Sequence, residues 1–468
     1  MNETTNTEQL TPLDLLMPNT YIQLFLTFQT TEPTSLIQST LQRGLNAATV
    51  QLPWLLGRIV PTVMASGNQT LQIQWNAKSM PPVITNKGSV ESTYEALDSQ
   101  GMSTQNIPAE MWPLDSQALQ GSAMEGAPVF AASIFRFANE EGLGLCICAH
   151  HHVFDATGLA ELVRLWSLAT AGILPVDYST GLDRVNRLTK ALNGSLGVAS
   201  AHSVEDLWDS HPEFSRSPPA MPSEFPPCFS KLFRISMDKI EKLEQSVSNL
   251  MTVTPTTTNI VTAMLWITIT RARARRTPAL ANSTTHLVSA VNCRQRVGLG
   301  SKTGSVSYFG NVVQYAMAAL STGDLQVVDV VHETLPLCLA KVCSIISDSQ
   351  SVDRINSNSV AELCSLVNRT DDPKSIFPGW DLFSSRDLTV TSWNGLDIYN
   401  LDFGEALGKP KHIRPPYMEA DGVGMIMPRA QWTRHDGKEE SGVEVIVMLR
   451  RDDLAVLSED DIWVNFTN

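Results

Sequence analysis

The apolar positions in the first half of the chain follow two periods, one typical of helices and one typical of strands. Residues 34–45 carry apolar side chains at helical spacing, whereas residues 71–75 alternate between apolar and polar side chains. Two β-favouring runs, residues 128–137 and 143–149, flank a polar stretch that contains a glycine, and they predict a hairpin. Residues 1–10 are polar and show no period, so we expect a frayed tail there.

An amphipathic helix is predicted directly after the hairpin, over residues 159–170, with Thr157 as a candidate N-cap. In the second half of the chain, helical patterns cover residues 237–250 and 258–276. Strand-like runs lie at residues 287–291, 388–392 and 443–449. This mixture of periods predicts an α/β or α+β protein.

A proline-rich segment divides the chain. Six of the sixteen residues from position 212 to position 227 are proline. Because proline lacks a backbone donor and disfavours helix in the residue before it, this segment should be an extended connection. We therefore predict a first domain over residues 1–211, a linker over residues 212–228 and a second domain over residues 229–468.

The predicted helix over residues 258–276 ends in a basic run from Arg271 to Arg276. Cations at the C-terminus of a helix complement its dipole, so the favoured interpretation is a solvated helix end. A site for the phosphates of an anionic ligand is the alternative.

Composition narrows the class of protein. The chain has 468 residues, with 34 basic and 48 acidic side chains and a net charge of −14. A nucleic-acid binder needs a surplus of Lys and Arg, so nucleic acid is not an expected partner. The sequence shows no apolar run long enough for a membrane span, no secretory signal and no disulfide framework among its seven scattered cysteines. We expect a soluble, cytoplasmic monomer without a membrane partner.

Three consecutive histidines, His150, His151 and His152, end the second strand of the hairpin, and Asp155 follows them. Side chains alternate along a strand, so His151 should face away from its two neighbours. Neutral imidazole can accept a proton near pH 7, which makes His151 the candidate general base. Asp155 could orient this base or pair with an arginine elsewhere.

A metal site is an alternative interpretation of the same residues. His150 and His152 would form a His-x-His ligand pair, with Asp155 or Cys148 as a third ligand. No second cluster of ligands with suitable spacing accompanies them, so no metal is predicted. Nucleophilic catalysis is less favoured, because the chain has no Gly-x-Ser-x-Gly elbow.

Residues 150–155, His-His-His-Val-Phe-Asp, resemble the HHxxxD signature of the BAHD acyltransferases, which the wider superfamily of peptide-synthetase condensation domains shares. Other segments resemble further elements of the BAHD family in the same order. They are Leu-Thr-Pro-Leu-Asp at 10–14 with Tyr21, Leu-Pro-Trp-Leu-Leu-Gly-Arg at 52–58, Val-Asn-Cys-Arg-Gln-Arg at 291–296, Tyr-Phe-Gly-Asn at 308–311, Thr-Ser-Trp at 391–393, and 399–404 with 408–410. The resemblance therefore spans nearly the whole chain.

The resemblance implies an α/β fold of two similar chloramphenicol-acetyltransferase-like domains, with mixed β-sheets, flanking helices and a channel between the domains. Acyl-CoA would enter this channel on one side and a small-molecule acceptor on the other. His151 would deprotonate the acceptor, and Asp155 would pair with Arg294. Trp393 and Asn311 would contact the substrate or the developing oxyanion.

Further residues of the motifs would give structural support. The resemblance implies this role for His150 and Gly158 in the signature itself. Asp402, Phe403 and Gly404 would form a loop that supports the second domain and does no chemistry.

The chain also departs from the family pattern. Ala156 stands where the extended signature usually has glycine, and Asn292 replaces the usual aspartate. Residues 405–407 lengthen the segment after Gly404, which resembles the fungal, trichothecene-acetyltransferase-like branch. Residues 249–259 carry no charge, although plant members often place basic residues for CoA phosphates near that position.

The resulting prediction is an acyl-CoA-dependent O- or N-acyltransferase that acts on a small natural product. Acyl-CoA would be a co-substrate, and no permanently bound cofactor is expected. One alternative is a condensing or cyclising enzyme with a carrier-bound or intramolecular acyl donor. Another is a binding protein that has lost turnover.

Overall fold

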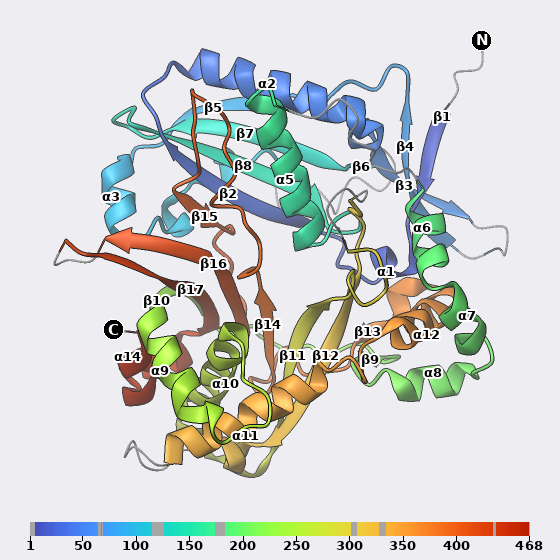
Figure 1. Cartoon of the computed structure of the whole chain (residues 1–468), viewed down its shortest axis with the longest axis vertical. Helices are drawn as coiled ribbons and strands as arrows, with labels where there is room; N and C mark the ends of the chain where they lie inside the picture. The colour runs from blue at the N-terminus through green and yellow to red at the C-terminus, as the bar shows by residue number, and fades with distance from the viewer. Residues whose placement is uncertain are drawn as a thin grey trace.

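A computed structural model describes residues 5–63, 67, 69–114, 126–173, 183–300, 307–326, 334–433 and 437–467. Within these ranges, two large mixed β-sheets organise the chain, each with helices packed against it (Figure 1). We call residues up to 211 the first half and residues from 229 the second half. The predicted mixed α/β architecture is confirmed.

The sheet of the first half has the strand order β15-β2-β8-β7-β5 among the described residues. Its strands are β2 (Tyr21–Gln29), β5 (Thr85–Ser89), β7 (Phe130–Arg136), β8 (Gly142–His150) and β15 (His412–Arg414). β7 and β8 form the predicted antiparallel hairpin, and β5 pairs parallel to β7.

The sheet of the second half has the order β10-β17-β16-β14-β11-β12 in the described part of the chain. Its strands are β10 (Cys228–Ser236), β11 (Thr284–Asn292), β12 (Val313–Ser321), β14 (Leu388–Ser392), β16 (Val423–Thr433) and β17 (Glu439–Arg450). The strands predicted at 287–291, 388–392 and 443–449 are thus confirmed as parts of β11, β14 and β17.

A smaller sheet shows where one prediction is wrong. Its order is β1-β4-β3-β6, with β1 (Thr5–Gln9), β3 (Arg58–Val63), β4 (Gln69–Asn76) and β6 (Ala127–Pro128). The strand predicted at 71–75 is confirmed as part of β4. Residues 5–9 of the expected frayed tail instead form β1, because their backbone pairs with β4 and the Glu8 carboxylate binds Arg184, while residues 1–4 lie outside the described residues. A polar strand held by these contacts has no apolar period to reveal it.

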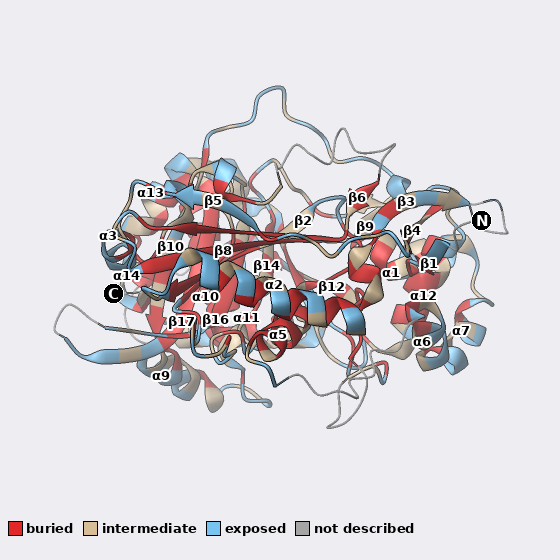
Figure 2. Cartoon of the chain, turned by 90° about the horizontal axis from the view of Figure 1, so that it is seen from above, coloured by how far each residue is buried: buried red, intermediate tan, exposed pale blue. Residues whose placement is uncertain are grey.

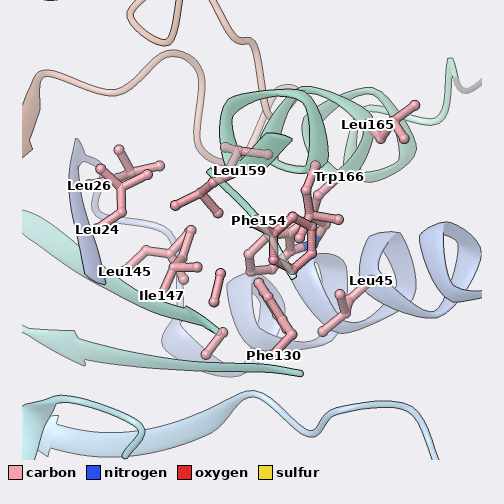
Figure 3. Close-up of a cluster of buried hydrophobic side chains, with 14 of the residues drawn as sticks. Leu24, Leu26, Leu45, Phe130, Leu145, Ile147, Phe154, Leu159, Leu165 and Trp166 are labelled. Atoms are coloured by element: carbon pink, nitrogen blue, oxygen red, sulfur yellow. The ribbon is translucent and has the colours of Figure 1, made fainter. Parts of the chain in front are cut away.

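Two helices, α2 (Thr34–Gln51) and α5 (Ala156–Thr170), pack on one face of the first sheet. Figure 3 shows their apolar side chains meeting those of β2 and β8. The indole of Trp166 on α5 donates a hydrogen bond to the Leu41 carbonyl of α2 (2.9 Å). Both predicted helices are confirmed, but Asp155 caps α5 in place of Thr157. Helix α3 (Tyr94–Ser99) contributes to the core on the other face.

The helix predicted over 258–276 is α10 (Thr257–Arg276), and its side chains are buried along most of its length. It packs with α9 (Met237–Ser248), α11 (Thr334–Ser349), α13 (Arg451–Glu459) and α14 (Asp461–Thr467). Figure 2 shows buried residues concentrated in the strands of both sheets, with exposed residues along the outer helices.

The two halves interlock beyond the proline-rich segment. Strand β15 comes from the second half and pairs with β2 of the first sheet. Helices from both halves share a third apolar core. They are α1 (Pro12–Leu15), α6 (Arg184–Ala191), α7 (Asn193–Ala199), α8 (Val204–Ser210) and α12 (Ser357–Asn368). Within the proline-rich segment, β9 (Phe214–Ser215) pairs with β13 (Phe377–Pro378). The domain boundary at 212–228 therefore stays a prediction. Strand β15 and helix α12 of the second half pack against elements of the first half.

Candidate active site

The three histidines lie where β8 ends and the chain turns into α5. His150 is fully buried, and its Nδ1 atom accepts a hydrogen bond from the His152 amide (3.2 Å). Its ring stacks on His152 and meets the ring of Tyr21 edge-on, with centroids 5.2 and 5.1 Å away. Burial lowers the pKa of His150 to about 3 and that of His152 to about 4. Both rings are therefore neutral packing elements near pH 7.

His151 differs from its neighbours because the residue is partly exposed, although Nδ1 of its ring is buried. The protein holds its main chain on both sides. The His151 amide donates to the Thr20 carbonyl (2.8 Å), and its carbonyl accepts from Nδ2 of Asn311 (2.9 Å). Burial lowers the pKa of His151, while nearby main-chain carbonyls and Asp155 oppose that shift. The imidazole is therefore neutral near pH 7, the state in which it can accept a proton.

The Asp155 carboxylate accepts hydrogen bonds from donors in both halves of the chain. Its Oδ1 accepts from the Gly158 amide (2.8 Å) at the start of α5. Both carboxylate oxygens accept from Arg294 in a bidentate ion pair (2.8 and 2.9 Å), and the Val312 amide donates to Oδ2 (3.1 Å). The guanidinium also donates to the Tyr308 carbonyl (3.0 Å). This buried pair joins the histidine turn of the first half to the second half.

Gly158 and Asn311 allow the second half to approach this turn closely. A Cβ atom at position 158 would lie 2.1 Å from the Phe309 carbonyl oxygen, so only glycine fits there. Asn311 is fully buried, and both its amide and its Nδ2 donate to Oδ1 of Asp14 (2.8 Å each). With Nδ2 also bound to the His151 carbonyl, the contacts of Asn311 are internal. Its contact with an oxyanion stays a prediction.

Trp393 follows β14 and is almost fully buried, at 6% exposure, in the same apolar core as Phe154. Its main-chain amide donates to the Ile426 carbonyl (2.7 Å). Among the described residues, no hydrogen bond joins its indole nitrogen to another group. The predicted role of this N–H toward the oxyanion is thus still a prediction.

The loop of Asp402, Phe403 and Gly404 was expected to support the second domain, but its aromatic side chain packs into the first half. Phe403 is fully buried, with its ring 5.2 Å from that of Phe28 and 6.2 Å from that of Trp166. Gly404 has a φ of +85°, and Asp402 accepts a hydrogen bond from its amide (2.9 Å) while facing solvent. The chain reaches this core because β15, a few residues later, pairs with β2.

A cavity of about 410 Å³ lies beside the Asp155–Arg294 pair. Its lining residues come from α5 and from segments of the second half. They are Thr157, Ala160, Glu161, Arg164, Arg294, Leu299, Ser307, Tyr308, Gly395, Leu396, Asp397, Ile398 and Leu401. Both arginines in this lining have carboxylate partners, Glu161 and Asp155. No pattern in the sequence pointed to residues 395–398, whereas Leu401 belongs to the motif at 399–404.

The basic run at the end of α10 is engaged with carboxylates. Arg271 and Arg273 are buried, so the expected solvated helix end is wrong for them. The ion pairs are Arg271 with Asp460 (3.2 Å), Arg273 with Asp421 (3.1 Å), Arg275 with Asp460 (3.3 Å) and Arg276 with Asp453 (2.6 Å). These aspartates come from distant segments of the chain and compensate the charge of the run.

The metal interpretation gains no support from the geometry of the histidines. Nδ1 of His150 already accepts a main-chain hydrogen bond. The described part of the chain contains no group of three or more His, Cys, Asp or Glu residues that could hold a metal ion. In the same part, no helix is long and apolar enough to cross a membrane.

Two residues near the site, Asp14 and Arg184, are not among the site residues predicted from the sequence. Asp14 binds Asn311, and Arg184 donates to the Val153 carbonyl (3.1 Å) within the histidine turn. Asp14 ends the Leu-Thr-Pro-Leu-Asp segment, so the resemblance offered a signal for it. Nothing in the sequence marked Arg184, because its partners are distant.

The chain has two halves, each built around a large sheet, and Arg294 of the second half forms an ion pair with Asp155 of the HHxxxD turn in the first half. Together with the match to a family model, this arrangement defines a transferase of the BAHD type. The family model described as "Transferase family" matches residues 2–462, and the chain belongs to this family. The family prediction is confirmed.

Curated relatives and solved structures match over nearly the whole chain. Trichothecene 8-O-acetyltransferase of Fusarium sporotrichioides is 26% identical, over 97% of this chain and 97% of its own length. Communesin N16 acyltransferase of Penicillium expansum is 23% identical, over 97% and 96%. The structure of F. sporotrichioides TRI101, complexed with coenzyme A and T-2, has a TM-score of 0.79 at 19% identity and covers 98% and 99% of the two chains. Vinorine synthase has a TM-score of 0.63 at 16% identity, over 98% and 94%.

Proposed function

We propose that this protein is an acyl-CoA-dependent O- or N-acyltransferase for a small natural-product acceptor, with His151 as its general base. The observation that carries the proposal is that His151, unlike its two buried neighbours, is partly exposed on a main chain that the protein holds from both sides. Relatives named as O-acetyltransferases and acyltransferases, and a similar structure with coenzyme A, support the reaction class.

In the proposed reaction, His151 accepts the proton of the acceptor hydroxyl or amine as that group attacks the thioester carbonyl. Nδ1 of His151 is enclosed by protein, so Nε2 is the nitrogen that we assign to the base. The resulting tetrahedral intermediate expels the CoA thiolate, which takes the proton back from the imidazolium. No acyl-enzyme forms. Trp393 or main-chain N–H groups would stabilise the oxyanion, a contribution that is often large.

We assign the 410 Å³ cavity to the acceptor. Its arginines are paired with carboxylates, which disfavours the phosphates of CoA, and Leu299, Leu396 and Ile398 supply apolar surface. A small, weakly polar molecule suits this lining. His151 is not among the described residues that line the cavity, so the acceptor would have to extend past the Asp155–Arg294 pair to reach the base.

The test is release of free CoA from acetyl-CoA in the presence of a panel of hydroxylated and amino natural products. His151→Ala should lower kcat by about 10²- to 10⁴-fold, the usual contribution of a general base. Because its pKa is lowered, the wild-type kcat/KM should fall only as the pH drops below 6.5. His202→Ala, at a partly exposed histidine far along the sequence, is the matched control. Full activity of His151→Ala would overturn the mechanism.

A carrier-bound acyl donor is the second candidate. The paired arginines at 271–276 and the uncharged segment 249–259 favour it, because the charge of the arginines is compensated and the segment carries none. Intact-mass detection of acyl transfer from a loaded carrier protein, with no turnover of free acyl-CoA, would establish it.

A further inference from the structure

Asp14 is a fully buried carboxylate whose two oxygens serve different parts of the molecule. Oδ2 accepts from the amide and the hydroxyl of Thr11 (2.8 Å each), which caps the short helix α1. Oδ1 accepts from the amide and Nδ2 of Asn311 (2.8 Å each). The first set of contacts is local, whereas the second reaches the other half of the chain.

Two side chains bound to Asp14 continue to the histidine turn. Asn311 uses the other hydrogen of Nδ2 for the His151 carbonyl (2.9 Å). Nη1 of Arg184 lies 3.5 Å from Oδ2 of Asp14 and donates to the Val153 carbonyl (3.1 Å). The carbonyls of His151 and Val153 are thus both held by donors that contact the same carboxylate.

These two carbonyls matter because the turn lies outside the strand ladder of β8 and before the first turn of α5. The direction of the His151 carbonyl is coupled to the ψ torsion of His151, from whose Cα atom the ring projects, and the bond to the Val153 carbonyl holds the same turn two residues further on. A misplacement of about 1 Å at a reacting group can lower a rate by roughly 10²-fold.

We propose that Asp14 is a positioning residue, which holds Asn311 and Arg184 on the turn carbonyls and thereby aims the His151 ring at the acceptor. The inference rests on the proposed function of His151. Asp14 itself is sealed inside the protein and touches no substrate.

The separate roles of the two oxygens provide matched variants. Thr11→Val removes the hydroxyl that binds Oδ2 and keeps the Asn311 contacts, so it tests capping alone. Asp14→Asn replaces one of the two oxygens by an NH2 group that faces only donors, and it removes the negative charge next to Arg184. Asn311→Ala keeps the main-chain contact with Asp14 and removes both side-chain hydrogen bonds, the one to Asp14 and the one to the His151 carbonyl.

In the CoA-release assay, Asp14→Asn and Asn311→Ala should each lower kcat by about 10- to 100-fold, with KM changed by less than about threefold. Thr11→Val should keep kcat within about threefold of the wild type. The double variant Asp14→Asn/Asn311→Ala should lose no more than the worse single variant, because both changes break one connection. Circular dichroism and thermal unfolding give the folded fraction used to normalise each rate.

Three results would overturn the inference. They are a wild-type kcat in Asn311→Ala, losses that multiply in the double variant, and an equal loss in Thr11→Val. Its failure is distinct from failure of the proposed function, which would show as full activity in His151→Ala. If His151→Ala abolishes turnover and Asn311→Ala does not reduce it, only the role of Asp14 is wrong.

Discussion

Two motif segments tie the halves together, the histidine turn at 150–158 and the loop at 402–404, and they do so by different physical means. At the turn, the carboxylate of Asp155 and the guanidinium of Arg294 form a buried bidentate pair. At the loop, the ring of Phe403 packs between Phe28 and Trp166. Each motif contains an aspartate, but Asp155 is buried with several donors, whereas Asp402 is exposed with a local one.

The difference explains why one contact can serve chemistry and the other stability. Charge-assisted hydrogen bonds are directional, so the clamp on Asp155 fixes the geometry of the turn that carries His151. Apolar packing depends on area and shape, so Phe403 can hold the halves together without aiming any group. Membership in a motif therefore does not define the role of an aspartate, because that role depends on the burial of its carboxylate and on its hydrogen-bond partners.

Exchange of the two aspartates for asparagine should separate these roles most sharply. Asp155→Asn puts an amide among four donors and leaves Arg294 without its charge partner, so the free energy of unfolding should drop by about 3–5 kcal/mol. CoA release should fall as well, by at least about tenfold, because the turn loses its fixed geometry. Chemical denaturation and the CoA assay measure the two effects.

Asp402→Asn is the matched control for that exchange. Its carbonyl oxygen can still accept from the Gly404 amide at the surface, so stability should change by less than about 0.5 kcal/mol. Equal losses in both variants would contradict the distinction between a clamping and a local aspartate.

Truncation of Phe403 should weaken the apolar contact alone. Phe403→Ala removes a fully buried ring from the core and should cost about 3–5 kcal/mol of unfolding free energy. At a temperature where the variant is folded, its kcat should stay near that of the wild type, since no polar contact of the turn is changed. Phe403→Leu, which keeps an apolar side chain, should lose less stability. A large loss of kcat in folded Phe403→Ala would show that this loop also positions the site.

The buried histidines of the turn should contribute to the pH dependence of stability. His150 and His152 have pKa values of about 3 and about 4 in the folded chain, against 6.5 as the ordinary value. The unfolded chain therefore binds more protons below pH 6.5, and stability falls as the pH decreases toward the folded values. Each histidine contributes a slope of about 1.4 kcal/mol per pH unit in this range. Denaturation series from pH 7 to pH 4.5 measure the slope.

His152→Gln should lower that slope by about 1.4 kcal/mol per pH unit, the contribution of one histidine. A slope that His152→Gln does not alter would show that the buried rings of the turn are not its source.

Local patterns in the sequence were sufficient for most of the fold. Helices α2, α5, α9 and α10 follow the helical spacing of their apolar residues, and the β7–β8 hairpin follows two β-favouring runs around a glycine. These elements bury one face or both, and burial leaves a period that can be read along the chain. Strand β1 escaped detection because its partner β4 lies some seventy residues further on, and its polar side chains carry no period.

The sequence by itself determined the family and the candidate base, because His151 and its neighbours form one contiguous motif. Only the tertiary structure decided what the remaining charged and polar groups do. It paired Arg271–Arg276 with distant aspartates, turned Asn311 toward Asp14 and placed Phe403 in the first half. Such contacts join residues more than a hundred positions apart, and their energy depends on distance and burial, which no local spacing encodes.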